Sequence, residues 1–431
     1  MRPAVVAGFG AGMFGASLGM ALVPLLLLYY MTEYAGIPAA TAGVLLAIPK
    51  FADLLFDPWI GRGTDRWARL RGSRASVIGW SVSLLPALLA LLFLPLDALP
   101  AAARVAVLAT LLVTQSLLTT AFAVAQTALA GDLAPDLAGR GTLLSARAFG
   151  ATIAGLTLAA LAPQLVAAFG GGRSGYVAAA MALAVLAALM LLLAWATARG
   201  TPVSAGAETD AAQSLWTALR CVVRNRPFLG VAATSALMGC ATTSLMSLMP
   251  YVNQHLLQGP PQQLSALLSP LFAALLVGIA VTPWLLRRLR PLRLLAVTTL
   301  ATLAGMVWLG AGPRNVPSMA GALGLIGIAG GIGTVVLSTL AVEVATRSAG
   351  QGQSLGLYLG LMFSADKLGQ SGGGMVAGFG VAWAGIGASA GQAAAPQAVQ
   401  RLAEVFLWAP LLAMTSGLVL LAWLALNWRE S

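Results

Sequence analysis

Charged residues are scarce in this chain of 431 residues. They make up 9% of it, whereas an ordinary soluble domain carries about 25%. Hydrophobic residues make up 59%, and the mean hydropathy is +0.88. This composition predicts an integral membrane protein. The net charge of +11 does not indicate a nucleic-acid-binding protein, because no soluble segment gathers the basic residues into a patch.

Cysteine and histidine are also nearly absent, with two cysteines, Cys221 and Cys240, and one histidine, His255. So few thiols cannot form a disulfide framework or a spaced metal motif, and a single histidine has no partners for a catalytic triad. The glycine clusters at 330–333 and 372–374 are not followed by a lysine, so neither predicts a phosphate-binding loop. We therefore expect no enzyme activity, no cofactor, no bound metal and no ATP-driven transport.

Long apolar runs fill most of the chain. Each covers about 20 to 27 residues, which is the length of a helix that crosses a hydrocarbon core of about 30 Å. We expect an all-α integral membrane protein with twelve transmembrane helices in two pseudo-symmetric six-helix bundles. The predicted helices lie near residues 4–30, 38–60, 75–95, 102–128, 143–168, 176–198, 227–251, 263–286, 292–311, 317–343, 354–383 and 403–427.

The arginines test this count independently of hydropathy. When both termini are placed on one side, that side receives eighteen arginines and the opposite side receives four. Cytoplasmic loops of membrane proteins are enriched in arginine and lysine. The distribution therefore predicts a multi-pass protein of the bacterial inner membrane with both termini in the cytoplasm.

The longest hydrophilic segment lies at the midpoint of the chain. It predicts three parts: a six-helix bundle over residues 1–198, a cytoplasmic linker over 199–226, and a second bundle over 227–431. The two bundles resemble each other, since residues 127–141 align without gaps with 338–352. A duplicated bundle commonly places its substrate near the membrane midplane between the halves.

Three charged residues interrupt the second predicted helix. Lys50, Asp53 and Asp57 lie at i, i+3 and i+7, so they share one helix face. Each costs about 2.5 to 3.5 kcal/mol at the centre of a bilayer on insertion scales, and such residues are usually functional. Two carboxylates one turn apart favour binding of a proton or cation. The alternative is a static ion pair between Asp57 and Lys50, with Asp53 capping or bridging to a basic loop residue.

Several segments together resemble one transporter family. Gly61, Asp65 and Arg66 match the G-x-x-x-D-R signature of the major facilitator superfamily. The segments KFADLLFDPWIG, ALAGDLAPDLAGRGTLLSAR and GLYLGLMFSADKLG are similar to parts of the glycoside-pentoside-hexuronide:cation symporters, the family of the melibiose carrier. The resemblance implies an alternating-access fold. It also implies that Gly61, Asp65 and Arg66 act in gating, whereas a solvated loop charge is the simpler interpretation of Asp65 and Arg66.

The resemblance also assigns the coupling and substrate sites. It implies a cation site at Asp53 and Asp57, tuned by Lys50, with Thr120 as a further ligand. For the substrate it implies Arg147 and Lys367, and neutral hydrogen bonds from Gln126 are possible. The family's two sugar-binding aspartates align with Ser17 and Ala123. The substrate site is therefore poorer in carboxylates than the family pattern, although Ser17 still lies where substrate is expected.

We therefore expect a secondary active transporter that couples proton or sodium entry to symport of a sugar, uronate or organic acid by alternating access. One alternative is a proton-coupled exporter of small apolar compounds, and another is a membrane protein that only senses or scaffolds. The expected partners are a small-molecule substrate and the lipid bilayer, with no nucleic acid and a monomeric state. The substrate, the coupling ion and the direction of transport stay open.

Overall fold

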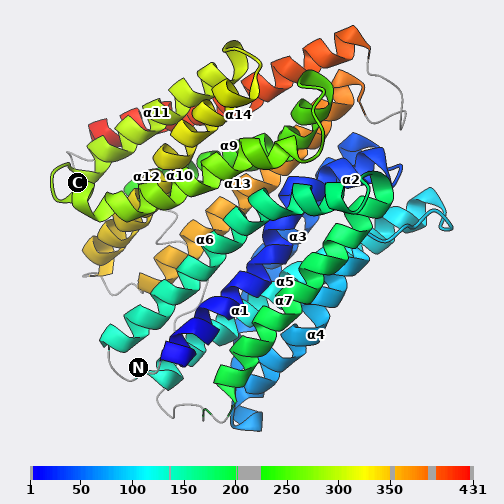
Figure 1. The fold of residues 1–431 in the computed structure, drawn as a ribbon. Helices are drawn as coiled ribbons and strands as arrows, with labels where there is room; N and C mark the ends of the chain where they lie inside the picture. The colour runs from blue at the N-terminus through cyan, green and yellow to red at the C-terminus, as the bar shows by residue number, and fades with distance from the viewer. Residues whose placement is uncertain are drawn as a thin grey trace. The chain divides into compact units, whose positions relative to one another are not determined.

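The computed structural model describes residues 3–134, 137–199, 201, 225–349, 355–386 and 395–427, and Figure 1 shows their arrangement as helices. Within these ranges there is no β-strand. Ten of the described helices are long and apolar enough to cross a membrane. Two further helices are the shorter apolar helix α4 (Ala75–Leu91) and helix α13 (Leu355–Ala384), which polar residues interrupt. With them, the described residues form twelve membrane-length or apolar helical segments. The prediction of an all-α membrane fold is confirmed.

Two compact units divide these helices. The first unit holds α1 (Pro3–Leu22) with η1 (Val23–Leu27) and α2 (Leu28–Glu33), α3 (Ala39–Arg71), α4, α5 (Ala101–Leu133), α6 (Leu137–Ala168) and α7 (Gly172–Ala198). The second unit holds α9 (Arg226–Tyr251) with η2 (Val252–Leu256), most of α10 (Gln263–Leu286), α11 (Pro291–Ala311), α12 (Val316–Ala349), α13 and α14 (Pro396–Asn427). The predicted linker at 199–226 falls almost entirely outside the described residues, so its boundaries stay a prediction.

The two units follow the same packing plan. In the first unit α1 packs against α6 and α7, and α4 packs against α5 and α7. In the second unit α9 packs against α13 and α14, and α11 packs against α12 and α14. Each first helix also contains a π-helical segment next to a proline, η1 at Pro24 and η2 after Pro250. The shared plan agrees with the internal repeat seen in the sequence.

Several helices continue beyond their predicted ends. Helix α3 was expected to end near residue 60, but it continues to Arg71 and ends where Gly72 adopts a left-handed conformation with φ of 69°. Glycine takes this conformation without a steric cost, and it commonly ends helices. The expectation that Asp65 and Arg66 lie in a loop is therefore wrong. Hydropathy detects only the part of a helix inside the bilayer, whereas polar residues extend the same helix into water.

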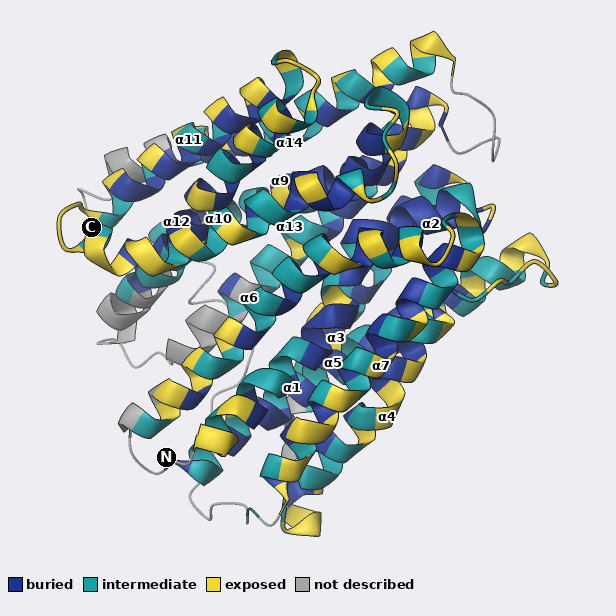
Figure 2. Cartoon of the chain, in the orientation of Figure 1, coloured by how far each residue is buried: buried dark blue, intermediate teal, exposed yellow. Residues whose placement is uncertain are grey.

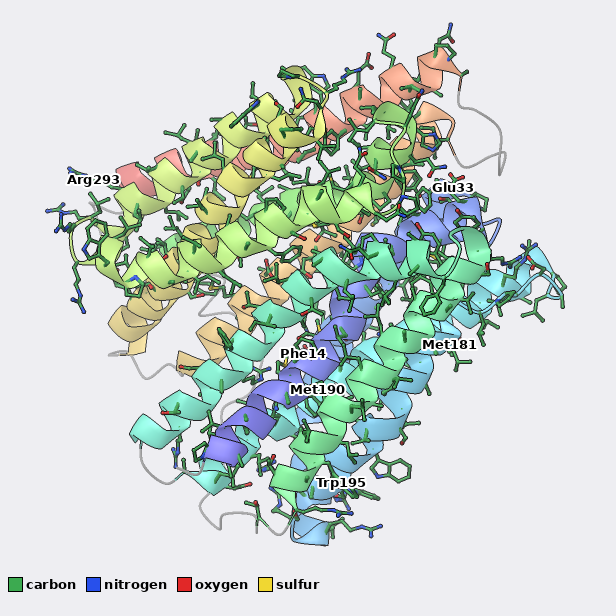
Figure 3. All side chains as sticks on the ribbon, in the orientation of Figure 1. Phe14, Glu33, Met181, Met190, Trp195 and Arg293 are labelled. Atoms are coloured by element: carbon green, nitrogen blue, oxygen red, sulfur yellow. The ribbon has the colours of Figure 1, made fainter. Side chains whose placement is uncertain are left out.

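Glycines let the helices approach closely within each unit. A Cβ atom added at Gly150 of α6 would overlap the carbonyl oxygen of Gly10 on α1. Likewise a Cβ at Gly331 of α12 would overlap the carbonyl oxygen of Leu275 on α10. On the other side of α1, Figure 3 shows Phe14 beside Met190 of α7, where the two helices are in contact. Within the glycine cluster at 330–333, Gly331 thus lies at a close contact between helices.

Each unit has its own apolar core, while many large apolar side chains remain exposed. Phe9, Phe122 and Leu191 are buried together from α1, α5 and α7. By contrast, Val185 of α7 is 61% exposed and Val419 of α14 is 71% exposed. Figure 2 shows exposed and buried residues following one another along the same helices. Exposed aliphatic side chains in long helices suit a protein whose outer surface meets lipid.

We predict that Gly327→Ala destabilises the second unit. An added Cβ at Gly327 would overlap the carbonyl oxygen of Leu271, which is backbone and cannot rotate away. A Cβ at Gly324, one turn earlier on α12, would meet nothing within 4 Å. Thermal unfolding in detergent should show a lower midpoint for Gly327→Ala. Gly324→Ala should be unchanged or more stable, since alanine favours a helix over glycine by about 1 kcal/mol. Equal midpoints would contradict the packing described.

Candidate functional site

The central residue of the site is Asp53, midway along α3. It is 1% exposed, and its Oδ2 accepts a hydrogen bond of 2.8 Å from the Oγ hydroxyl of Ser116. Ser116 lies midway along α5, the helix that packs against α3. Two apolar transmembrane helices are thus joined by a carboxylate and a hydroxyl. A buried carboxylate is tolerated only where charge or hydrogen bonds compensate for lost hydration.

Lys50 and Asp57 lie on the same face of α3, one turn to either side of Asp53. Both side chains are half-buried, and each takes part in at least one interaction within the described structure. The predicted shared face of the three charges is therefore present in a continuous helix. One cation and two carboxylates leave this stretch of α3 with a formal charge of −1 when all are ionised, which attracts a further cation.

Ser116 is the residue of this site that sequence reasoning missed. Thr120, which was predicted as a ligand, lies half-buried one turn further along α5. The two residues are four apart, so they share the helix face that α5 presents at this level. A search for hydroxyl residues at i−4 from Thr120 would have found Ser116. The resulting set of oxygen-bearing side chains is Asp53, Asp57, Ser116 and Thr120.

The second unit has lost this polar set. In the register of the internal repeat, Asp53 corresponds to Gly278, Ser116 to Gly327 and Thr120 to Gly331. A Cβ at Gly278 would overlap the carbonyl oxygen of Ile328 on α12. The residue corresponding to Asp57, Thr282, is buried and donates its hydroxyl to the carbonyl of Gly278 at 2.7 Å on its own helix. Close backbone contact therefore replaces the polar side chains at these positions.

Arg147 lies on α6, three residues before the glycine contact between α6 and α1. Its side chain is half-buried, and its Nε is buried without a hydrogen-bond partner among the described residues. A buried guanidinium N–H that is left without an acceptor is costly. A bound ligand with a hydrogen-bond acceptor would satisfy this N–H group of Arg147.

The other predicted substrate residues differ in their surroundings. Lys367 of α13 is half-buried and takes part in at least one interaction. Gln126 is 1% exposed and donates its Nε2 to the carbonyl of Phe9 on α1 at 2.7 Å. Ser17 is 7% exposed in the middle of α1. The burial of Gln126 and Ser17 favours a role in joining helices, and their assignment to substrate stays a prediction.

The three residues predicted to act in gating belong to the last third of α3. Arg66 is exposed on that helix. The placement of Gly61 and of the Asp65 side chain lies outside what the structure describes. The gating role of Gly61, Asp65 and Arg66 therefore stays a prediction.

A buried ion pair lies in the first unit near the residues where α3 ends. Nε of Arg74, at the start of α4, donates to Oδ2 of Asp132, near the end of α5, at 2.8 Å. The two side chains are only 4% and 5% exposed. The sequence did not predict this pair, because a loop arginine and a helix-end aspartate give no signal of their pairing.

Comparison with known proteins decides the family. The model of the family described as MFS/sugar transport protein matches residues 8–427. The chain belongs to this family. Its members and relatives are transporters and not enzymes. The isoprimeverose transporter of Lactiplantibacillus pentosus is 23% identical over 419 residues, which cover 92% of this chain and 83% of that protein. An uncharacterized symporter of Synechocystis sp. is 43% identical, but over only 65 residues, 14% of this chain and 12% of the relative.

Solved structures agree on the fold. A bacterial homologue of the human lysosomal transporter Spinster, inward-facing and unoccupied, superposes with a TM-score of 0.74 at 15% identity, covering 99% of this chain and 96% of its own. The nucleoside transporter NupG superposes with a TM-score of 0.72 at 15% identity over the whole of both chains. At this identity the likeness establishes the major facilitator fold alone.

We predict that breaking the Arg74–Asp132 pair destabilises the first unit strongly. Arg74→Gln leaves a buried carboxylate without its guanidinium, which typically costs about 3 to 5 kcal/mol. The double variant Arg74→Met with Asp132→Leu removes both charges and should lose much less. Thermal unfolding in detergent compares the variants. A double variant as unstable as Arg74→Gln would contradict this account of the pair.

Proposed function

We propose that this member of the MFS/sugar transport family is a secondary active transporter that couples cation movement to symport of a small polar solute by alternating access. The family assignment and the isoprimeverose transporter relative support transport of a sugar or a related solute. The chain is a multi-pass membrane protein, and we place it in the bacterial inner membrane as a monomer. The arginine distribution supports cytoplasmic termini.

The observation that carries the proposal is the buried contact between Asp53 and Ser116. An ionised carboxylate that is almost fully buried between two apolar helices is strongly stabilised by a bound cation or proton. Asp57, one turn away, adds a second carboxylate, and Thr120 adds a second hydroxyl. Lys50 keeps the net charge of the empty site low. Loading the site then lowers the cost of carrying it through the membrane interior.

The contrast with the second unit supports a specific site rather than a general need for polar residues. The same helix pair in the second unit packs through Gly278, Gly327 and Gly331, so these helices need no polar side chains to associate. A static ion pair that only joined helices would be replaceable in the same way. Its retention in one unit alone favours ion coupling.

Arg147 supports a substrate with a hydrogen-bond-accepting or acidic group. Its buried Nε lacks an acceptor among the described residues, and a guanidinium binds a carboxylate through two parallel hydrogen bonds. Lys367 adds a second cationic residue on α13. A uronate or another organic acid therefore suits these residues better than an apolar compound. The rival proposal, a proton-coupled exporter of small apolar compounds, rests on the absence of the family's sugar-binding aspartates at Ser17 and Ala123.

We predict that Asp53→Asn abolishes coupling, because the amide carries no charge to attract a cation. In proteoliposomes, addition of a transported sugar or uronate should evoke proton or sodium entry for the native chain but not for Asp53→Asn or Asp57→Asn. The ion that moves identifies the coupling ion. Asp97→Asn is the matched control, since Asp97 is an exposed carboxylate outside the helices. Evoked entry that persists in Asp53→Asn would refute the site.

We predict a graded effect for Ser116→Ala. This variant removes the one hydrogen bond to Asp53 described above, and a hydrogen bond to a charged group contributes about 1.5 to 3 kcal/mol. If the hydroxyl also contacts the cation, the half-saturating cation concentration should rise about tenfold or more. Uptake measured against cation concentration gives this value. Ser83→Ala, an exposed serine on α4, provides the control. An unchanged value would exclude Ser116 from the cation site.

A further inference from the structure

One buried glutamine of the first unit belongs to none of the sites described above. Gln115 lies midway along α5 and is 5% exposed, and its Oε1 is buried with no hydrogen-bond donor among the described residues. A buried amide oxygen without a donor destabilises the fold, because it has lost its contact with water and gained no bond in return. A ligand that donates a hydrogen bond would satisfy it.

The amide of Gln115 lies against α1 at a glycine. Helices α1 and α5 pack against each other in the first unit (Figure 1). A Cβ atom added at Gly19 of α1 would overlap Nε2 of Gln115, and among the described residues no other helix comes within 4 Å of it. The side chain missing at Gly19 therefore leaves the space that this amide occupies.

A second glutamine on α5 provides a comparison, because its amide is anchored. Gln126 lies three turns after Gln115 on the same helix face, and it also lies against a glycine of α1, Gly12. Its Nε2 donates to the carbonyl of Phe9 at 2.7 Å. No comparable bond holds the side chain of Gln115 among the described residues. Gln126 thus joins two helices through its amide, whereas Gln115 does not.

Gln115 lies at the level of the predicted cation site but on another face of α5. The next residue, Ser116, donates its hydroxyl to Asp53 on α3, whereas the amide of Gln115 lies against α1. Successive residues of an α-helix point about 100° apart, since one turn holds 3.6 residues. One turn of α5 therefore presents a hydroxyl to α3 and an amide to α1. This position suits a residue that binds solute beside the ion rather than the ion itself.

The chemistry of an amide suits a hydroxylated solute. The oxygen of a glutamine side chain accepts hydrogen bonds and its NH₂ group donates two, so one amide both accepts from and donates to the hydroxyl groups of a sugar. An ordered water is the alternative partner, because such waters commonly satisfy buried polar groups. The two alternatives differ in whether the affinity for solute depends on Gln115.

We propose that Gln115 binds a hydroxyl group of the transported solute and helps to determine which sugar-like solute the chain accepts. The proposal rests on the proposed transport function, and it adds a solute-binding residue to the first unit. Solute and cation are then bound by neighbouring residues of one helix, Gln115 and Ser116.

The test is equilibrium exchange in proteoliposomes, which needs no ion gradient. Native protein, Gln115→Leu and Gly19→Ala are each assayed with xylose, glucose and glucuronate and with single-deoxy analogues of each. The native chain should discriminate against one analogue about three- to tenfold, which corresponds to one hydrogen bond. Both variants should bind the parent solute more weakly by that factor and lose the discrimination. Gln400→Leu, at an exposed glutamine of α14, is the control and should keep the native ratio.

Thermal unfolding in detergent separates solute binding from a structural role. Gln115→Leu should unfold at the native midpoint or above it, because the variant removes a buried oxygen that has no donor. Gln126→Leu loses the hydrogen bond to Phe9 and should unfold at a lower temperature. A lowered midpoint for Gln115→Leu together with native discrimination would show that Gln115 serves packing, and it would overturn the proposal.

The remaining outcomes are also decisive. If Gln115→Leu does not fold, Gly19→Ala decides, since its Cβ displaces only the amide end of a flexible side chain. Native ratios in the folded variants refute the role of Gln115, as expected for an amide that binds only water, while the transport function stands. A changed half-saturating cation concentration with native solute discrimination also overturns the proposal, because it places Gln115 in the cation site. A native chain that exchanges none of these solutes refutes both proposals.

Discussion

The cost of placing a charged side chain in a low-dielectric bilayer is the constraint on which this structure depends. The chain has few charged residues, and it retains Lys50, Asp53 and Asp57 on one face of α3. Asp53 is the most buried of them and is held by the hydroxyl of Ser116 on α5. We propose that this buried carboxylate, which is costly to keep in the membrane, is the site where a cation or proton binds.

The two units show that the same fold does not require this charge. Corresponding helices pack in the same order in both units, yet α10 and α12 meet through glycines where α3 and α5 carry Asp53, Ser116 and Thr120. Backbone contact in the second unit thus stands where the first unit carries polar side chains. We propose that the first unit holds the ion site.

Hydropathy and arginine placement were sufficient to predict the helical membrane fold, because spanning segments must be long and apolar. They did not predict that α3 continues to Arg71, since helix ends in water carry no hydropathy signal. The charged face of α3 could be found because its spacing is local to one helix. The Ser116–Asp53 hydrogen bond and the Arg74–Asp132 pair each join separate helices, and such pairing is not encoded in local spacing. The bond from Gln126 to the carbonyl of Phe9 also joins two helices, while its assignment to substrate stays a prediction.

The most direct test of the central claim is the steady-state accumulation of a transported solute by native protein in proteoliposomes under cation gradients of increasing size. The account predicts an internal-to-external solute ratio that rises with the proton or sodium gradient and falls to one when an ionophore removes it. A solute ratio of one at every gradient, with measurable flux, would show that the carboxylates of α3 do not couple an ion to transport. It would then leave Asp53 and Asp57 as structural charges.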